Sequence, residues 1–505
     1  MPILLTWKTG SILYFSPEIF LSLAFCTLLA LSVFDKNTTT NKLMTFMLAS
    51  LFVGFILTLV VLIKFNGLEQ SQLVLMNNFV IDKYTLWSKL FILFLSAISV
   101  YIFQSSVYTR FKKVPAEFLI ILGFSVTASL FLISSFNWGL LFLSLEFLGI
   151  CTYCLLSLLK KDSYISIEAT IKYFAISALS SCFLLVGIFF FYTIFLDISF
   201  FAYKENFLLF TNSGNFLKVV TFTLLISFLI KLGCAPFHMW VPDVYEGVPT
   251  FMTFILSVVT KTIFFLFFVR LVSYLLFFGV SHVQFVLTMT AAFSIIVGCF
   301  GALFQKKIKR ILAYSSINNM GYMLLGLSLN TVEGTKFALM YAVFYFLAVT
   351  LVFMVILGTK ELDTTTNANK SALVYVTDLP KLTKGSKTML MFFSLALFSL
   401  AGIPPLSGFF IKFFILSSAM SAQLYFLAVV GALTSVVSAF YYVNLIKLTH
   451  FSKDNPSNAK ITSVSPGYVV VCGILTIGLI AIFLFPGALD NFFYSLSIAV
   501  TYPLA

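Results

Sequence analysis

Charged residues are scarce in this chain of 505 residues. Asp, Glu, Lys and Arg together make up 10% of it, and hydrophobic residues make up 60%. A typical soluble domain has about 25% charged residues. This composition excludes a soluble globular protein. It predicts an all-α polytopic membrane protein, because helices satisfy their own backbone polar groups in lipid.

Residues that bind metals or redox cofactors are scarce as well. The seven cysteines are scattered, and Cys151 and Cys154 form a lone C-x-x-C inside an apolar stretch, where packing is the expected role. The three histidines, His238, His282 and His450, form no pair at helical spacing. We therefore expect no haem, iron–sulfur or zinc site on this chain. The N-terminus also has no Arg- and Ser-rich transit sequence, and its first apolar segment is expected to remain as a transmembrane helix.

Long apolar stretches dominate what is present. The sequence predicts about fourteen transmembrane helices at the usual requirement of about 20 residues each. They are expected near residues 12–33, 43–63, 87–108, 116–135, 138–159, 173–196, 218–240, 250–270, 282–304, 309–329, 336–358, 388–421, 422–446 and 467–487. A last apolar stretch near 491–500 is predicted to be too short to cross.

The basic residues are distributed unequally between the two sides that fourteen spans define. Most lie on one side, which by the positive-inside rule faces the cytoplasm or matrix and leaves both termini on the other side. The cluster Lys306, Lys307, Lys309 and Arg310 belongs to this basic side and is interpreted mainly as an orientation anchor. The net charge of +13 therefore requires no nucleic acid, and the basic face is suited to anionic lipid such as cardiolipin.

Prolines interrupt the seventh predicted span at Pro236 and the twelfth at Pro404 and Pro405. The two broken spans are five helices apart, and an odd offset reverses direction across the bilayer. The placement predicts two inverted five-helix repeats, since paired broken segments are typical of ion sites at a repeat interface. The predicted domains are 1–115 (helices 1–3), 116–270 (first repeat), 271–446 (second repeat) and 447–505 (helix 14 and tail).

Four ionisable residues lie inside predicted spans. Lys231 is in 221-TFTLLISFLIKLGCAPFHMW-240, and Glu146 is in 138-WGLLFLSLEFLGICTYC-154. A lysine at the bilayer centre costs about 2.5–3.5 kcal/mol and needs a partner or a water-filled path. Glu146 is predicted to be the counter-ion of Lys231. The alternative is a neutral carboxyl group that bonds to a nearby serine or backbone group.

Two further lysines, Lys261 and Lys412, continue this series. Lys261 starts about 18 Å from Pro249 along a helix, too deep for easy snorkelling, and Lys412 follows Pro405 on the broken twelfth span. Burial of an amine favours its neutral form, so such lysines can exchange protons near neutral pH. We expect a proton relay through Glu146, Lys231, Lys261 and Lys412. A role as helix-end anchors is the alternative for Lys261 and Lys412.

Supporting polar groups are expected along the same route. Ser315, Ser316, Asn318 and Asn319 lie in one predicted span and could hold water between Lys261 and Lys412, or hydrogen-bond to neighbouring helices. His238 follows Lys231 in a polar loop, where it either stabilises the loop or joins the relay. Asp243 and Glu246 are expected to brace that loop.

Three segments also resemble the antiporter-like membrane subunits of respiratory complex I, and most closely the NADH dehydrogenase subunit 2 group. They are 231-KLGCAPFHMWVPDVYEGVPT-250, 306-KKIKRILAYSSINNMGY-322 and 401-AGIPPLSGFFIKF-413. The resemblance implies two inverted half-channels for protons. It implies that Glu146 and Lys231 are the family's ion pair, Lys261 its central lysine and Lys412 its terminal lysine.

The resemblance also implies partners and a location. It implies assembly with the other membrane-arm subunits of complex I, which would carry the flavin, the iron–sulfur clusters and the ubiquinone site, with no cofactor on this chain. It implies the mitochondrial inner membrane, with a bacterial plasma membrane as the alternative. The second function that stays open is a subunit of an Mrp-type cation/proton antiporter.

Overall fold

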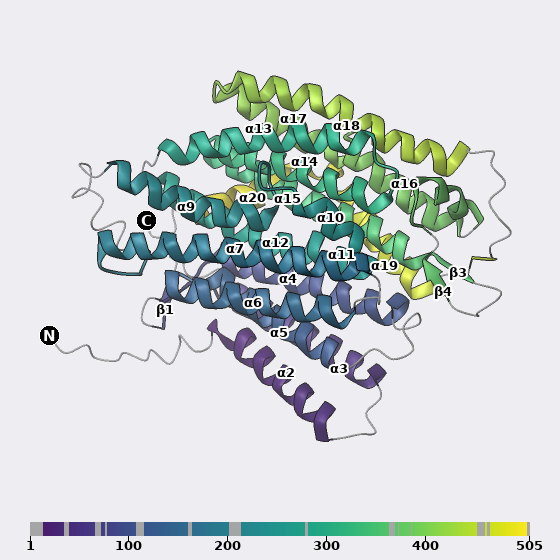
Figure 1. Ribbon diagram of the computed structural model, residues 1–505, viewed down its shortest axis with the longest axis horizontal. Coiled ribbons are helices and arrows are strands. Elements are labelled where there is room, and N and C mark those ends of the chain that lie inside the picture. Colours follow the sequence, from purple (N-terminus) through teal and green to yellow (C-terminus); the bar gives the residue numbers. More distant parts are fainter. Residues whose placement is uncertain are drawn as a thin grey trace.

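The computed structural model describes residues 14–34, 40–65, 72–75, 78–107, 116–159, 164–200, 214–277, 281–362, 369–371, 373–384, 386–451, 460–461 and 465–501. Most of the helices run side by side across the view of Figure 1. Among the described residues, eleven helices are long and apolar enough to cross a membrane. The prediction of a helical, multi-pass membrane protein is confirmed.

The N-terminal unit consists of α2 (Ser16–Phe34), α3 (Thr40–Phe65) and α4 (Lys83–Ile102), which continues into the π-helix η1 (Phe103–Val107). A short antiparallel hairpin, β1 (Gln72–Val74) and β2 (Phe79–Ile81), joins α3 to α4. Asp82 starts α4 because its side chain accepts a hydrogen bond from the backbone N–H of Thr85, 2.6 Å away.

The middle of the chain forms α5 (Ala116–Ser134), α6 (Trp138–Leu158), α7 (Tyr164–Phe195) and α9 (Gly214–Leu232). After a break come α10 (Trp240–Gly247), α11 (Thr250–Phe254), the π-helix η4 (Ile255–Thr260) and α12 (Lys261–Phe277). Within the segment Thr250–Leu276, all residues of an apolar stretch of 18 residues are buried inside the protein. A helix that is apolar and buried all round belongs at the centre of a bundle.

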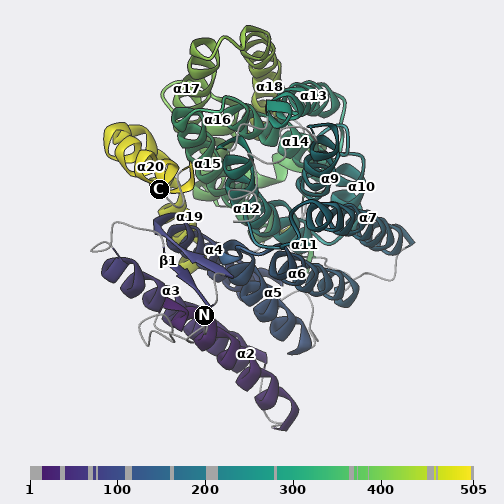
Figure 2. The same ribbon diagram turned by 90° about the vertical axis from the view of Figure 1, so that its left-hand side faces the viewer.

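The following part forms α13 (Ser281–Leu303), α14 (Ile308–Ser328), α15 (Val332–Gly358), α16 (Lys387–Ala401), α17 (Ser407–Ser421) and α18 (Tyr425–Phe451). The chain ends in α19 (Pro466–Leu484) and α20 (Pro486–Thr501), which packs on α15 and α12. Outside the bundle, β3 (Lys360–Leu362) pairs antiparallel with β4 (Asn369–Ser371) and β5 (Lys460–Ile461), and η5 (Val376–Lys384) precedes α16. Figure 2 shows α2 and α3 on one flank of the bundle and α17 and α18 on the opposite flank.

The eleven apolar helices coincide with eleven of the predicted spans. Two of the other three predicted spans correspond to α9 and α14. The third corresponds to α16 and α17 together, and each of these two helices has 15 residues. The exact count of fourteen stays a prediction. The π-helix η4 directly before Lys261 was not foreseen, and π-helices of this kind are frequent at functional sites.

Both predicted helix breaks are present, and their backbones match. Gly233 and Gly402 end α9 and α16 with positive φ angles of 70° and 80°, a conformation that glycine adopts without strain. The next N–H group reaches back in the same way at both breaks, from Cys234 to the Leu229 carbonyl (3.1 Å) and from Ile403 to the Phe398 carbonyl (3.3 Å). The division into two inverted repeats and the four domain boundaries stay predictions.

Ion pairs join α10 to two neighbouring helices. Lys172 contacts Asp243 at 2.9 Å, and Lys307 and Arg310 both contact Glu246. Asp243 and Glu246 thus brace α10 against α7 and α14, as expected. Burial opposes the charge of Glu246, but Lys307 and Arg310 outweigh it and lower the pKa of Glu246. Several of the predicted basic residues lie outside the described residues, namely Lys36, Arg110, Lys112, Lys113, Lys160, Lys161 and Lys453.

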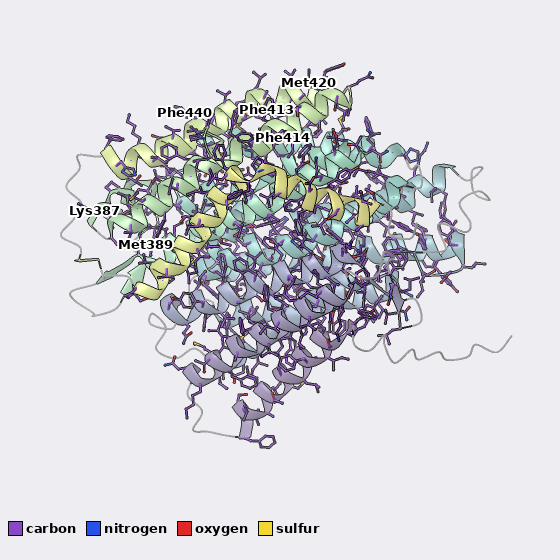
Figure 3. All side chains as sticks on the ribbon, turned by 180° about the vertical axis from the view of Figure 1, so that it is seen from behind. Lys387, Met389, Phe413, Phe414, Met420 and Phe440 are labelled. Atoms are coloured by element: carbon purple, nitrogen blue, oxygen red, sulfur yellow. The ribbon has the colours of Figure 1, made fainter. Side chains whose placement is uncertain are left out.

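The outer surface is apolar, as lipid requires. Figure 3 shows Phe413, Met420 and Phe440 along α17 and α18. Their side chains are 56%, 49% and 67% exposed. Large apolar side chains at such exposure are unfavourable in water and stable against acyl chains.

Candidate functional site: buried lysines within the bundle

Lys231 lies in the last turn of α9, directly before the first break. Its side chain is 6% exposed, and its ammonium group lies 5.6 Å from the ring centre of Phe264 on α12. A small cavity adjoins it, lined among others by Gly149 of α6 and Tyr173 and Ser177 of α7. The space open to the centre of a water-sized sphere is about 10 Å³, which is close to the minimum for one water molecule.

Glu146 lies on α6, one turn before the cavity-lining residue Gly149. Its carboxylate is near enough to Lys231 to act on it electrostatically. Within the described residues the two do not form a direct ion pair, and the buried Oε1 atom of Glu146 has no hydrogen-bond partner. The structure therefore brings the predicted pair into the same region but leaves a gap between the two charges.

The short helix α10 connects the first lysine to the second. Trp240 lines the cavity beside Lys231 and donates its indole N–H to the Ile230 carbonyl (3.0 Å), which also accepts the backbone N–H of Gly233 (3.1 Å). Tyr245, just over one turn later, places its ring centre 5.5 Å from the ammonium group of Lys261. One short helix therefore places Trp240 at the cavity beside Lys231 and Tyr245 beside Lys261.

Lys261 is the first residue of α12 after the π-helix and is 1% exposed. Its ammonium group donates a hydrogen bond to the Ser316 hydroxyl on α14 at 2.9 Å. Within the described residues it has no carboxylate partner. This burial does not fit a helix-end anchor that reaches the surface, and the relay role of Lys261 stays a prediction.

One face of α14 carries the route onward from Lys261. Ser316, Asn319 and Tyr322 are three residues apart, and residues at this spacing lie on one face of a helix. Asn319 accepts a hydrogen bond from the Tyr341 hydroxyl (2.7 Å) and donates to the Ser315 carbonyl (2.8 Å) and the Tyr442 hydroxyl (3.4 Å). The predicted polar groups of this span therefore hydrogen-bond to neighbouring helices, and they also line up between two lysines.

Lys412 on α17 ends this line and is 5% exposed. Its ammonium group lies 5.5 Å from the ring centre of Tyr322 and donates to the carbonyls of Leu400 (3.0 Å) and Ala401 (3.4 Å). These carbonyls end α16, where the helix dipole favours a positive charge. The second break therefore provides the partners of Lys412, and the relay role of this lysine stays a prediction as well.

Asn318 and His238 remain less connected. Asn318 is 0% exposed, and within the described residues its side-chain amide makes no hydrogen bond of normal geometry, although the Tyr441 hydroxyl lies near it. His238 lies in the loop between α9 and α10, is 7% exposed, and lies near the backbone of Pro236. The role of His238 as a relay or loop residue stays open. A buried amide without a partner, such as that of Asn318, is costly and usually binds ordered water.

Sequence reasoning missed several buried groups. Four tyrosines complete the line of hydroxyl groups and rings: Tyr245 of the polar loop, and Tyr322, Tyr341 and Tyr442, whose signal was a tyrosine within an apolar span. Two ion pairs were missed as well. Glu18, in the first turn of α2, pairs with Lys89 at 0% exposure for both side chains, and Asp82 pairs with Arg270 at 2.5 Å.

Helices broken at matching glycine–proline turns, with buried lysines on three separate helices, define an antiporter-like membrane protein. Among the described residues, no group of three or more His, Cys, Asp or Glu side chains is placed to hold a metal ion. The chemistry available along the line is the holding and transfer of protons by amines, one carboxylate and hydroxyl groups.

Comparisons with known proteins agree with this class. The family described as "NADH:quinone oxidoreductase/Mrp antiporter, TM" matches residues 134–438, which include all four predicted relay residues. NADH-quinone oxidoreductase subunit N of Pelagibacter ubique is 33% identical over 87% of this chain and 90% of its own length. NADH-ubiquinone oxidoreductase chain 2 of Marchantia polymorpha is 33% identical over 74% of this chain and 75% of its own. The chain belongs to the NADH:quinone oxidoreductase/Mrp antiporter membrane family, and its resemblance to the subunit 2 group is confirmed.

Solved structures share the fold. A chain of respiratory complex I from Thermus thermophilus superposes with a TM-score of 0.77 at 24% identity, over 94% of this chain and 98% of its own. A chain of the Mrp complex from Dietzia sp. superposes with a TM-score of 0.80 at 16% identity, over 96% and 97%. The fold is therefore common to chains of complex I and of the Mrp complex, and the fold alone does not distinguish between these two groups.

Proposed function

We propose that this chain is a proton-translocating membrane subunit of an NADH:ubiquinone oxidoreductase, respiratory complex I. The observation that carries the proposal is the buried line of groups from Lys231 through Lys261, Ser316, Asn319 and Tyr322 to Lys412. The complex I names of the relatives at 31–36% identity favour this function over an Mrp-type antiporter.

In this proposal Glu146 controls the charge of Lys231 without direct contact between the two side chains. A carboxylate that moves toward an ammonium group stabilises the proton on it, and one that moves away releases it. Water in the cavity and beside Asn318 would connect the side chains, and the hydroxyl groups of Tyr341 and Tyr442 would extend the connection along α14 and α18. The reduction of quinone in partner subunits would supply the energy.

The proposed partners are the other membrane-arm subunits of complex I, together with phospholipid at the basic end of the bundle. Flavin, iron–sulfur clusters and the quinone site are assigned to those partner subunits. The proposed location is the mitochondrial inner membrane, with a bacterial plasma membrane as the alternative, since relatives of both origins match. Fractionation of the source cells decides between them.

The test uses the whole membrane assembly in proteoliposomes, with NADH oxidation and proton uptake measured together. Lys231→Ala, Lys261→Ala and Lys412→Ala are each expected to lower the protons moved per NADH oxidised and the coupled rate of quinone reduction. Lys64→Ala is the matched control, because Lys64 is an exposed lysine at the end of α3. A wild-type proton ratio in assembled Lys231→Ala and Lys412→Ala complexes would remove these lysines from the path. Isolation of the chain in a small assembly without flavin would favour the Mrp-type function.

A further inference from the structure

A cavity between the first turns of α9 and α13 is not part of the lysine line. The space open to the centre of a water-sized sphere is about 220 Å³, far larger than the cavity beside Lys231. Its lining combines two basic residues, Lys218 and His282, with an apolar wall of Val219, Phe222, Leu225, Val283 and Val286. It lies at the end of the bundle opposite the basic cluster, where α9 and α13 both begin (left in Figure 1).

The basic residues lie at the mouth of this cavity. Lys218 is the fifth residue of α9 and His282 the second residue of α13, and Lys218 is close enough to oppose a positive charge on His282. Lys218 therefore supplies the positive charge of the mouth, and the neutral imidazole of His282 can donate one hydrogen bond. Lys218 is exposed and His282 is half-buried. The two helix starts add N–H groups and positive dipole ends, which favour an anion at the same place. The mouth of the cavity is therefore complementary to a negative group.

The apolar wall extends from this mouth along the flank of the bundle, where Phe222 is 49% exposed. Phe222 and Leu225 lie one and two turns beyond Lys218 on α9, and Val286 lies one turn beyond His282 on α13. A small soluble anion would contact only the mouth, and a lipid without negative charge would match only the wall. A molecule with a negative headgroup and an acyl tail matches both parts.

We propose that this groove binds an anionic phospholipid, with its phosphate at Lys218 and His282 and one acyl chain against Phe222, Leu225 and Val286. The site is separate from the lysine line and does not depend on the proposed function. It also differs from the lipid contact proposed above, since it lies at the less basic end of the bundle. Anionic lipid held there would fix the spacing of α9 and α13 at their starts.

The experiment uses the whole assembly in vesicles of phosphatidylcholine that contain a trace of photoreactive lipid. One probe is phosphatidylglycerol with a diazirine on its acyl chain, and the other is phosphatidylcholine with the same chain. After illumination, mass spectrometry quantifies adducts on peptides that cover 218–225 and 282–286. A lysine near anionic lipid contributes about 1 kcal/mol, or about fivefold in occupancy. We therefore expect about fivefold more adduct from phosphatidylglycerol.

Three variants complete the test. Lys218→Gln should lower the phosphatidylglycerol adduct about fivefold and leave the phosphatidylcholine adduct unchanged. Lys83→Gln, at an exposed lysine of the same end that does not line the cavity, should change neither. Val286→Trp, which fills the apolar wall, should abolish both adducts while NADH oxidation shows that the assembly is intact. Equal labelling by the two lipids, or cross-links from these peptides to a protein partner, would overturn the proposal.

Discussion

The ion pair between Glu18 of α2 and Lys89 of α4 gives the sharpest stability prediction. Both side chains are 0% exposed, and Lys89 also lies 5.6 Å from the ring centre of Phe15. Glu18→Gln keeps the shape of the side chain but leaves the Lys89 ammonium group without a charged partner. The loss of one partner from a buried pair costs about 3–5 kcal/mol. The expected result is detachment of α2 from the core and a strong loss of assembled protein.

The second variant separates charge from packing. In Glu18→Gln/Lys89→Met the unpaired charge is removed, and apolar replacement of a buried pair is often neutral or stabilising. Assembly should therefore recover in the double variant. Glu168→Gln is the control, because Glu168 pairs with Lys172 at 47% and 41% exposure, where a pair contributes about 0–1 kcal/mol.

The assay is the amount of assembled complex in membranes and its midpoint of thermal unfolding. The single variant Glu18→Gln should lower both strongly, Glu168→Gln should leave both near wild type, and the double variant should restore most of the loss. Equal losses in the single and the double variant would refute the reasoning, because they would show that shape and not charge determines the contact between α2 and α4.

Three further predictions concern other parts of the bundle. Ser316→Ala removes the hydroxyl partner of Lys261 and should lower the protons moved per NADH, whereas Ser328→Ala, which loses only a bond within α14, should not; equal ratios in proteoliposomes would contradict a role for Ser316. Gly408→Ala should prevent assembly, because its Cβ would lie 1.8 Å from the Ser399 carbonyl oxygen, while Gly478→Ala on α19 has no atom within 4 Å and should assemble normally on native gels. The pKa of the Glu246 carboxyl group is lowered in the folded protein, so the carboxylate stabilises the fold at pH values above its ordinary pKa of 4.5, and this stabilisation is lost as the pH falls below 4.5. The unfolding of Glu246→Gln should therefore depend less on pH in the acidic range, and an unchanged acid-unfolding curve would count against the bracing role.

The helix breaks could be predicted from the sequence, because glycine and proline act locally. Gly233 and Gly402 have the positive φ angles that end a helix, and prolines follow each within a few residues. The same local logic placed Lys231 and Lys412 beside the breaks. The partners of these lysines could not be predicted, since Lys261 meets Ser316 across 55 positions of the sequence. Glu18 and Lys89 are similar in this respect, because no periodicity relates residues on α2 and α4.

The buried cations fall into two groups by the kind of partner they have. Lys89, Arg270 and Lys336 each contact a carboxylate, of Glu18, Asp82 and Asp490 respectively. Each of these pairs joins two different helices, so the three cations act as fixed contacts within the bundle.

Within the described residues, Lys261 and Lys412 have only neutral partners, a hydroxyl group for one and two helix-end carbonyls for the other. Dipoles stabilise an ammonium group less than a full charge does, so these amines can lose a proton at less cost. Lys231 is intermediate, because Glu146 acts on it without direct contact. A relay requires this order. The proton affinity of the first site must change with the position of a carboxylate, and the sites that follow must accept and release the proton without a carboxylate partner.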